Sequence, residues 1–366
     1  MRILQAILSE GFYGSERYCI ELAVAQARAG HAVTVLSHGR DTDCGRQFAA
    51  AAERVAHDGS VKQGGSLALT TIPRWTPAIL QRPFAMNAIR RVAPEIVHSH
   101  LNPAARRVGR MAQRHGIPHV LTLHLGYDAN EHSRIDGVIA LSSNQRGEIS
   151  EGFSGQVATV WNWLPRTVET ALERVAMRQI AERRAAWQAD DKTIVFGSIG
   201  RLMPEKGMDW LIEAFRKAFP AGTDNVRLVV VGEGDQRPTL ERLGAGDRRV
   251  ILTGQQTEIA SCYRAIDVFV SAARYEPFSL AIIEAMGAGC RLIATRIYGT
   301  LEFVTDSRAL WVNPDNIDEL AVQLRAAASV ERTRFNYDMT PFQLARASAE
   351  IEDFYRRLIT PGVRST

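Results

Sequence analysis

The chain has 366 residues, of which 46% are hydrophobic and 23% are charged, and it carries a net charge of +4. This length exceeds what one hydrophobic core usually organises, so we expect two globular domains, and the composition argues against a disordered protein. No apolar run reaches the roughly 18 residues of a membrane-spanning helix, and four cysteines without CxxC spacing argue against a zinc knuckle or a disulfide scaffold. We therefore expect a cytoplasmic protein with reduced thiols.

Apolar segments of strand length alternate with amphipathic helical stretches in the first part of the chain. We expect strands at 3–8, 31–37, 96–100, 119–124, 138–142 and 156–161, with helices at 16–29 and 103–115. Such alternation is typical of βαβ units and a parallel sheet. Residues 1–165 are thus predicted to form an N-terminal Rossmann-like domain.

A second series of strands and helices follows a charged helical stretch at 166–191, which we interpret as a connector. We expect strands at 193–199, 227–231, 250–253, 268–271, 291–294 and 310–312, and helices at 208–218, 238–243, 258–265, 280–288 and 317–328. Short apolar runs between helices indicate strands buried on both faces, so residues 192–341 are predicted to be a second α/β domain. A helix at 342–359 is a candidate for crossing back to the first domain, and residues 360–366 are predicted to be a flexible tail.

Two consecutive doubly wound units would place a ligand in a crevice between the carboxyl ends of their strands. The stretch 274–289 fits such a site, because Glu276 lies in a loop after a predicted strand and Glu284 lies eight residues later in a helix. Two solvent-facing glutamates would be the simpler interpretation. Glu284, however, lies among Leu280, Ile283 and Met286, so its carboxylate needs a polar partner, which ribose hydroxyls would supply.

Two cations occupy the loop that follows the predicted strand at 193–199. Arg201 and Lys206 lie between Gly200 and Gly207, just before a helix begins. A cation pair and free backbone N–H groups at this position suit a diphosphate, although each charge alone could be an ordinary surface charge.

Glycines and histidines in the first domain give weaker signals. Gly11 and Gly14 follow the first strand, where a glycine permits close approach of the backbone to a phosphate, although a structural turn explains both equally well. His98 and His100 point to one side of a strand, but no third ligand is evident, so we expect no metal site. His124, at the end of another strand, is either a ligand-binding or a buried histidine.

These motifs together resemble the retaining GT-B glycosyltransferases classed as family four (glycosyl transferases group 1). The resemblance covers nearly the whole chain and rests on the order and spacing of its motifs, which are the N-terminal glycine loop and residues 138–143, 161–162, 200–207, 231–234, 276–284, 299–302 and 313–315. It implies the GT-B architecture, in which two Rossmann-like domains face a central cleft, with residues 1–165 on the acceptor side and residues 192–341 binding the nucleotide-sugar donor. It also implies transfer of a sugar from a nucleotide-sugar donor without a metal ion.

The resemblance further implies roles for individual residues. Arg201 and Lys206 would neutralise the donor diphosphate, Glu276 would bind hydroxyls of the transferred sugar, and Glu284 would bind the ribose. His124 would contact the donor sugar or the acceptor, and Gly14 and Gly232 would lie close to the donor. Pro277 stands where the family frequently has glycine, so the donor-binding amides would come from Phe278 and Ser279.

The resemblance implies retention of the anomeric configuration, and the sequence offers no obvious carboxylate nucleophile for a double displacement. We therefore expect a front-face reaction in which the leaving phosphate helps to deprotonate the acceptor hydroxyl. UDP is the predicted nucleotide, no cofactor is expected, and the base, the sugar, the linkage and the oligomeric state stay open.

The acceptor is expected to be a glycan or glycolipid, as in lipopolysaccharide or surface polysaccharide biosynthesis, with no role for nucleic acid. Arginines at 106, 110 and 114 would form a basic stripe that could contact an anionic membrane, although a solvated helix face explains them as well. An epimerase or hydrolase of the same fold and a non-catalytic nucleotide- or glycan-binding homologue are the alternatives. An NAD-dependent oxidoreductase is poorly supported, because the first loop lacks GxGxxG.

Overall fold

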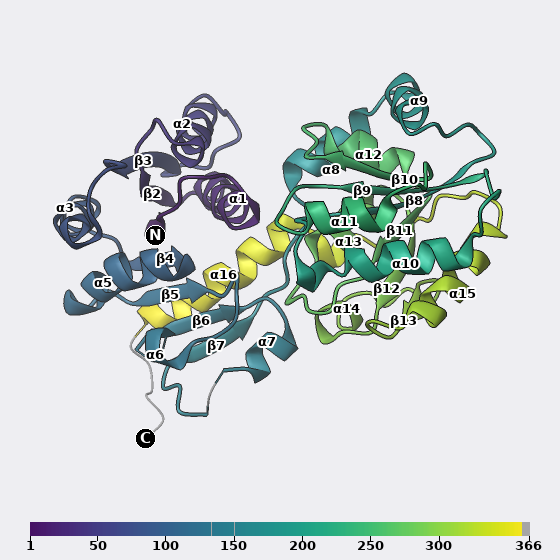
Figure 1. Cartoon of the computed structure of the whole chain (residues 1–366). Coiled ribbons are helices and arrows are strands. Elements are labelled where there is room, and N and C mark those ends of the chain that lie inside the picture. Colours follow the sequence, from purple (N-terminus) through teal and green to yellow (C-terminus); the bar gives the residue numbers. More distant parts are fainter. Residues whose placement is uncertain (133, 150, 361–366) are drawn as a thin grey trace. The chain divides into compact units, whose positions relative to one another are not determined.

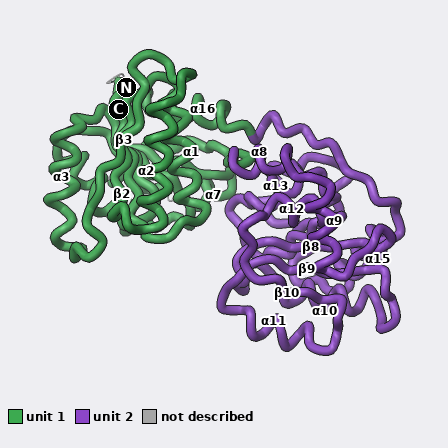
Figure 2. The backbone as a smooth tube through the Cα atoms, turned by 90° about the horizontal axis from the view of Figure 1, so that it is seen from above, with its two compact units in different colours: residues 1–165, 343–366 green, residues 166–342 purple. Residues whose placement is uncertain are grey.

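The computed structural model describes residues 1–132, 134–149 and 151–360, and the predicted tail lies almost entirely outside this range. The chain divides into two compact units, unit 1 with residues 1–165 and 343–366 and unit 2 with residues 166–342, coloured green and purple in Figure 2. Each unit is built on one parallel sheet (Figure 1). Within the described residues no helix is both long and apolar enough to cross a bilayer.

Unit 1 contains a seven-stranded sheet in the order β3-β2-β1-β4-β5-β6-β7. The strands are β1 (Arg2–Ile7), β2 (Ala32–His38), β3 (Ser66–Ile72), β4 (Ile96–His100), β5 (His119–Thr122), β6 (Gly137–Ala140) and β7 (Gln156–Thr159). Its longer helices are α1 (Gly14–Arg28), α2 (Asp43–Ala56), α3 (Gln81–Val92) and α16 (Leu344–Ile359). Shorter segments are η1 (Ala78–Leu80), α4 (Leu101–Ala104), η2 (Ala105–Gly109), α5 (Arg110–Arg114), α6 (Ala129–His132) and α7 (Ser143–Gly147).

Strand β1 shows how the two faces of this sheet are covered. Leu4 and Ala6 pack in an apolar cluster with residues of α3 and α5, whereas Gln5 points to the opposite face and bonds to α1 and α16. This alternation follows from the two-residue period of a strand. Helix α16 lies along the sheet of unit 1 (Figure 1), and a Cβ atom on Gly137 of β6 would lie 2.7 Å from the side chain of Leu358 and 2.8 Å from the ring of Phe354, so an added methyl group would force these side chains of the helix to shift.

Unit 2 contains a six-stranded sheet in the order β10-β9-β8-β11-β12-β13. The strands are β8 (Ile194–Ile199), β9 (Val226–Val231), β10 (Val250–Gly254), β11 (Val268–Ser271), β12 (Arg291–Thr295) and β13 (Leu310–Val312). The helices are α8 (Arg166–Arg174), α9 (Met177–Ala186), η3 (Pro204–Lys206), α10 (Met208–Ala218), α11 (Arg237–Gly244), α12 (Ile259–Ala265), α13 (Leu280–Gly287), α14 (Tyr298–Leu301), α15 (Ile317–Ala328) and η4 (Thr340–Phe342).

One apolar cluster organises unit 2. It joins the buried faces of α10 and α15 to one face of β8, β9 and β11, and both helices are amphipathic with their apolar side chains toward the sheet. Helices α8 and α9 cover residues for which the sequence predicts a connector, and they group with unit 2. All four cysteines of the chain are buried and unpaired.

The prediction of an α/β fold with two doubly wound parallel sheets is confirmed. Three elements between the second and third predicted strands, α2, β3 and α3, were not predicted. The helix predicted at 103–115 is interrupted, because residues 105–109 form a π-helical segment between α4 and α5.

Candidate functional site

The strand order of each sheet locates its ligand edge. In unit 2 the strands β8, β9 and β10 follow one another toward one edge of the sheet. The chain then returns to β11 on the other side of β8, so the strand order reverses between β8 and β11. In doubly wound folds, ligands bind outside the carboxyl ends of the strands at such a switch point. The loops that leave β8 and β11 contain Arg201, Lys206 and Glu276.

Lys206 and Glu276 meet at this switch point. The Nζ atom of Lys206 donates a hydrogen bond to Oε2 of Glu276, and both side chains are partly buried. Lys206 ends the short helix η3, and Glu276 lies 70 residues later in the loop before α13. The structure thus brings two of the predicted site residues into direct contact.

Arg274 ties together the segments that carry this pair. Its guanidinium donates to both carboxylate oxygens of Asp209 at 2.9 Å each, to Asp315 at 2.7 Å and to the carbonyl of Pro204 at 2.6 Å. Its backbone N–H donates to the carbonyl of Glu205 at 2.8 Å. Hydrogen bonding to Asp209 raises the pKa of Arg274, and burial opposes that rise only in part. The loop before Glu276 is thereby fixed against η3, which contains Lys206.

Glycines allow the loops to approach one another closely. Gly232 has a φ of 142°, and a Cβ atom there would lie 1.9 Å from the carbonyl oxygen of Gly200. Gly299, after β12, would place a Cβ atom 1.8 Å from the carbonyl oxygen of Glu276. Real Cβ contacts do not occur at these distances, so both positions require glycine.

The other predicted donor-site residues of unit 2 are near this edge in different settings. Arg201 has an exposed side chain in the loop after β8. The ring of Phe278 is buried and stacks on Phe303 at 4.5 Å between centroids, so its side chain is a packing group. Ser279 is the N-terminal cap residue of α13, where amide groups at the start of the helix could meet an anion.

Glu284 has a polar partner in the protein. The hydroxyl of Tyr263, on α12, donates a hydrogen bond of 2.7 Å to Oε2 of Glu284, and both residues are buried. Burial, and then the charge of Glu284, raise the pKa of Tyr263 well above 10, so the hydroxyl stays protonated and able to donate. The buried carboxylate therefore does not depend on a ribose alone for its stabilisation.

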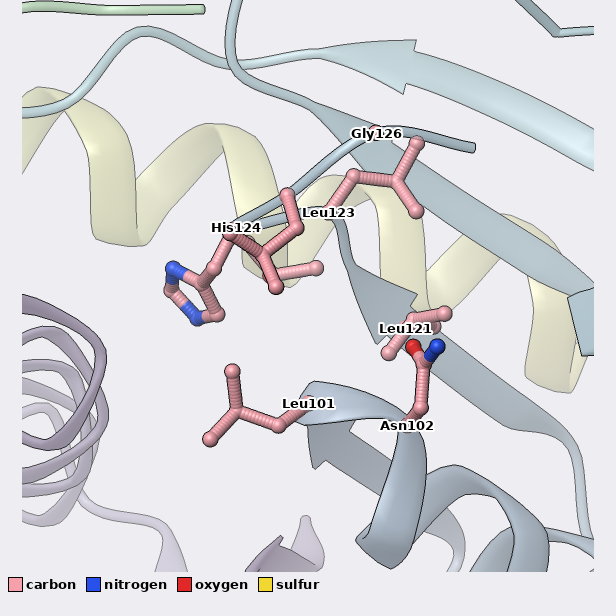
Figure 3. A pocket seen from close by; sticks show the side chains of 8 residues that line it. Leu101, Asn102, Leu121, Leu123, His124 and Gly126 are labelled. Atoms are coloured by element: carbon pink, nitrogen blue, oxygen red, sulfur yellow. The ribbon is translucent and has the colours of Figure 1, made fainter. Parts of the chain in front are cut away.

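In unit 1 the strand order reverses between β1 and β4, and polar side chains gather at the carboxyl ends of β4 and β5. His124 follows β5 and helps to line a small pocket with Leu101, Asn102 and the residues from Leu121 to Gly126 (Figure 3). Leu101 has a φ of 67°, a left-handed conformation that costs a non-glycine residue about 1–3 kcal/mol. Such strain is common where a loop is shaped by a ligand site.

His124 is held by a chain of buried polar groups. Its Nε2 lies 3.1 Å from Nδ1 of His100, and Nε2 of His100 lies 2.8 Å from Oε1 of Gln5. Burial lowers the pKa of His124 to about 3 and that of His100 well below 6.5. Both rings are therefore neutral at physiological pH, and His124 can exchange hydrogen bonds but cannot act as a cationic acid.

His98 belongs to the same network, on the side of α16. Its Nδ1 lies 2.6 Å from the hydroxyl of Tyr355, and its Nε2 lies 2.7 Å from Oγ1 of Thr122. Both ring nitrogens of His98 thus have protein partners. No group of three or more potential metal ligands occurs among the residues that the structure describes.

The N-terminus of α1 differs from the expected phosphate site. Gly14 is the first residue of this helix, and neither Gly11 nor Gly14 has a positive φ. The carboxylate of the buried Glu16 accepts hydrogen bonds from the N–H of Tyr13 at 2.9 Å and from Ser15 at 3.0 Å. A negative charge therefore already occupies this end of the helix, which weakens the case for a phosphate beside Gly14.

The predicted basic stripe is altered by the π-helical segment. Arg106 lies within this segment, and the three arginines at 106, 110 and 114 are exposed. A π-helical turn changes the angular spacing along the helix, so these residues do not follow the four-residue repeat of an uninterrupted α-helix. Arg106 is moreover paired with Glu131 at 2.8 Å.

Three residues of these sites were not identified from the sequence. Arg274 is the first residue of the stretch 274–289, for which the sequence predicts roles only for later residues, Tyr263 carries no signal in the sequence, and Gln5 lies in the middle of an apolar strand. A polar residue in an otherwise apolar strand is a usable signal, because a buried amide requires hydrogen-bond partners.

Two family models match the chain. The model described as Glycosyltransferase Family 4 matches residues 12–165, and the model described as Glycosyl transferases group 1 matches residues 193–329. Together they cover most of both units.

Curated relatives include a GDP-mannose-dependent alpha-mannosyltransferase of Mycobacterium tuberculosis, which is 28% identical over 335 residues, or 83% of this chain and 82% of that protein. An uncharacterized glycosyltransferase of Methanocaldococcus jannaschii is 34% identical over 140 residues, covering 37% of this chain and 35% of that protein. The lipopolysaccharide core biosynthesis mannosyltransferase LpsB of Rhizobium meliloti is 29% identical over 132 residues, covering 34% and 37%. The last two matches thus span little more than a third of those relatives.

Solved structures with a similar fold include a glycosyltransferase from Rickettsia africae, with a TM-score of 0.79 and 16% identity over 98% of this chain and 99% of that one. The structure of HepE from Anabaena, in complex with UDP and glucose, has a TM-score of 0.71 and 18% identity over 98% and 96% of the two chains.

Proposed function

Because the chain belongs to the family-four glycosyltransferases of the GT-B architecture, we propose that it transfers a sugar from a nucleotide-sugar donor to a glycan or glycolipid acceptor, with retention of configuration and without a metal ion. Family membership rests on the two matching models and on the fold. The details of the reaction are inferred from the residues at the switch point of unit 2.

The observation that carries the proposal is the contact between Lys206 and Glu276 at the carboxyl ends of β8 and β11. A sugar linked to a diphosphate presents negative charge next to neutral hydroxyl groups. Lys206, with the exposed Arg201 in the same loop, supplies positive charge for the diphosphate, and Glu276 supplies acceptor oxygens for the hydroxyls of the sugar. Such fixed charges are able to stabilise a leaving phosphate without a metal ion.

In the proposed reaction the bond between the anomeric carbon and the phosphate oxygen breaks as a bond to the acceptor oxygen forms on the same face of the sugar. The acceptor hydroxyl gives its proton to the leaving phosphate oxygen. Lys206 and Arg201 stabilise the charge that grows on that phosphate, and amide groups at the start of α13, near Phe278 and Ser279, add further donors. Glu284, which accepts from Tyr263, is proposed to bind the ribose.

His124, a partly buried residue that lines the pocket of unit 1, is proposed to contact the sugar or the acceptor. Its neutral state agrees with this role, because a neutral imidazole can accept a hydrogen bond from a hydroxyl.

The identity of the nucleotide has two different supports. One relative that matches over most of its length is named for its dependence on GDP-mannose, whereas HepE, which shares the fold at 18% identity, was solved with UDP. Sequence similarity over most of both chains is the stronger argument. We therefore place GDP-mannose first and the UDP-sugars of the sequence-based prediction second.

A thermal-shift screen in the presence of EDTA tests this proposal. GDP, UDP and ADP and their sugars are compared, because a ligand that binds only the folded protein raises its melting temperature by mass action. We expect one nucleotide to raise the melting temperature, and Lys206→Ala to remove most of the shift. A shift that appears only when a divalent metal is added would refute metal independence.

The alternatives are separated by product analysis of the same donor. A transferase consumes the donor at a rate that depends on the acceptor, whereas a hydrolase releases free sugar without one and an epimerase returns an altered nucleotide-sugar. Similarity to the Rhizobium meliloti enzyme supports a lipopolysaccharide core or related glycolipid as the first acceptor to be tried. Steady release of free sugar at the full rate would contradict the proposed transfer.

A further inference from the structure

The small pocket of unit 1 combines an apolar lining with two polar side chains that have hydrogen-bonding groups to offer. Its apolar lining comes from four leucines, Leu101, Leu121, Leu123 and Leu125. Figure 3 shows Asn102 and His124 on opposite sides of this pocket. None of the described lining residues bears a charge, because burial keeps the ring of His124 neutral. An apolar lining with a few polar groups is typical of a site for a small uncharged ligand.

The orientation of the Asn102 amide is fixed by His132, the last residue of α6. The backbone N–H of Asp128 donates to Nδ1 of His132 at 3.1 Å, so this nitrogen carries no hydrogen. Burial lowers the pKa of His132 below its ordinary 6.5, and the neutral ring therefore has its hydrogen on Nε2. That nitrogen lies 2.9 Å from Oδ1 of Asn102 and donates to it. The amide oxygen of Asn102 is thus occupied, and its NH2 group is left for another partner.

The two polar groups of the pocket have opposite hydrogen-bonding character. Among the residues that the structure describes, Nδ2 of Asn102 has no partner, and it is not one of the buried polar atoms left without one, so it is open to solvent and can donate. Nδ1 of His124 is an acceptor, because Nε2 of His124 donates to Nδ1 of His100, whose Nε2 donates to Gln5. The pocket therefore offers one donor and one acceptor from opposite sides.

We propose that this pocket binds one uncharged sugar ring and that Asn102 is a substrate-binding residue in it. The Asn102 amide donates to one hydroxyl oxygen of the ring, a second hydroxyl donates to Nδ1 of His124, and the C–H groups of the ring pack on the leucines. A phosphate or carboxylate fits less well, because it has no hydrogen to give to His124 and would meet no cation among the lining residues. The inference rests on the proposed function, in which the ring belongs either to the donor or to the acceptor.

Monodeoxy sugars identify the hydroxyl that Asn102 binds and the substrate that carries it. In the donor arm, dissociation constants are measured by calorimetry, without acceptor, for GDP-mannose and for analogues that each lack one hydroxyl of the mannose. In the acceptor arm, GDP-mannose is the donor, and kcat/KM is measured for methyl α-D-mannopyranoside and its monodeoxy analogues. The arm in which Asn102 matters assigns the ring to the donor or to the acceptor.

Asn102→Leu should bind or use the parent sugar about tenfold less well, because it loses one hydrogen bond. One analogue that the unaltered chain handles about tenfold less well than the parent sugar should become equal to the parent sugar in this variant. The penalty for the analogue that lacks the hydroxyl bound by His124 should persist. A purely structural role of Asn102 would not erase discrimination at a single hydroxyl.

Two variants separate the amide of Asn102 from the packing around it. His132→Leu removes the same hydrogen bond as Asn102→Leu but keeps the amide, so it should still distinguish the two sugars. Asn130→Leu changes an exposed asparagine of the same helix and should behave as the unaltered chain does. Equal loss of discrimination in His132→Leu and Asn102→Leu would overturn the inference.

Asn102→Asp provides a second test if Asn102→Leu folds poorly. It keeps an oxygen for Nε2 of His132, so its melting temperature should be nearly unchanged. Its carboxylate cannot donate, so it should reject the analogue with fluorine in place of the bound hydroxyl more strongly than the unaltered chain does. Equal treatment of that analogue by both proteins would contradict the assigned direction of this hydrogen bond.

The inference and the proposed function fail in different ways. Normal transfer by the unaltered chain, with unchanged discrimination among all analogues in Asn102→Leu, would overturn the inference alone. Absence of transfer from GDP-mannose and from the other nucleotide-sugars would refute the proposed function. Preference for a uronate over the neutral ring in either arm would overturn the assignment of the pocket to an uncharged sugar.

Discussion

Nε2 of His124 lies 3.1 Å from Nδ1 of His100, and this contact determines which nitrogen of His124 carries the proton. The amide nitrogen of Gln5 donates to Gln26 at 2.8 Å, so its oxygen faces Nε2 of His100, which must carry a hydrogen. The neutral His100 ring then has a lone pair on Nδ1, which accepts from His124. The Nδ1 of His124 is left as a hydrogen-bond acceptor.

The tautomer of His124 is accordingly the first prediction. Long-range ¹⁵N–¹H NMR spectra at pH 7 should show a protonated Nε2 and an unprotonated Nδ1 for His124. His124→Asn, whose side-chain oxygen can take the place of Nδ1, should retain more transfer activity than His124→Ala, with a difference of about tenfold for one hydrogen bond. The opposite tautomer, or equal activity of the two variants, would contradict the proposed direction of the network.

Lys206→Ala should lower turnover on the order of a hundredfold, because the loss of one preorganised contact costs about 3–4 kcal/mol in the transition state. The fold should survive, because the side chains of Lys206 and its partner Glu276 are both partly exposed. The control is Lys217→Ala, which removes a lysine that pairs with Asp318 in the same unit, on the outer face of α10. Near-normal turnover for Lys206→Ala, measured at saturating donor, would remove Lys206 from the proposed mechanism.

Arg274 is expected to act as a positioning residue, because it bonds to Asp209, Asp315 and the carbonyl of Pro204 around the Lys206–Glu276 pair. Arg274→Gln should raise the KM for the donor and lower kcat together, since the loops that hold both charges lose their shared contact. Removing a partly buried partner of Asp209 should also lower stability by about 1–3 kcal/mol.

The control for this prediction is Arg308→Gln, which removes an arginine that pairs with Asp306 elsewhere in unit 2. Steady-state kinetics and urea denaturation of both variants separate positioning from general destabilisation. If both variants changed donor KM equally, Arg274 would have no special link to the site.

The fold was largely predictable because its strands are short and buried on both faces. The expected limits of β4 and β13 agree with the structure to the residue, and so do those of α10 and α15. Strand β3 was missed because its alternating residues include Ser66, Thr70 and Thr71, and only three of its seven side chains are apolar at buried or partly buried positions. Helix α3 was missed because its apolar pattern is weak: the large Phe84 side chain is exposed, and two of its four buried residues are alanines. Tertiary contacts override weak local patterns in both cases.

Of the candidate site, the contact between Lys206 and Glu276 could be predicted from the sequence, although the two residues belong to motifs 70 residues apart. Lys206 and Glu276 each follow a predicted strand, and the order of parallel strands brings such loops to one edge. The partner of Glu284 was not predictable, because Tyr263 is 21 residues away on another helix and its contact depends on how the helices pack. The expected phosphate site at Gly14 relied on a turn pattern and took no account of Glu16, whose carboxylate caps the helix.

Gly299→Ala should impair the donor site selectively, because its Cβ atom would lie 1.8 Å from the carbonyl oxygen of Glu276 and would displace that loop. We expect at least about a tenfold loss of turnover together with a smaller nucleotide-dependent thermal shift. Gly222→Ala is the control: its φ of 94° strains the backbone, but no atom lies within 4 Å of the added group. Intact donor binding in Gly299→Ala would show that the position of Glu276 is not critical.

Acid should destabilise unit 1 through its buried histidines. Burial lowers the pKa of His119 to about 3, whereas the unfolded chain titrates near 6.5. Between these values the unfolded state binds more protons, so this contribution to stability is present above about pH 6.5 and is lost as the pH falls below it. From pH 7 to pH 5 the loss of unfolding free energy contributed by this histidine is about 2 kcal/mol.

His119→Gln should therefore show a correspondingly weaker decrease in urea stability over this range, whereas His57→Gln, at an exposed position, should show the full decrease. Equal pH dependence of the two variants would mean that His119 is protonated in the folded protein.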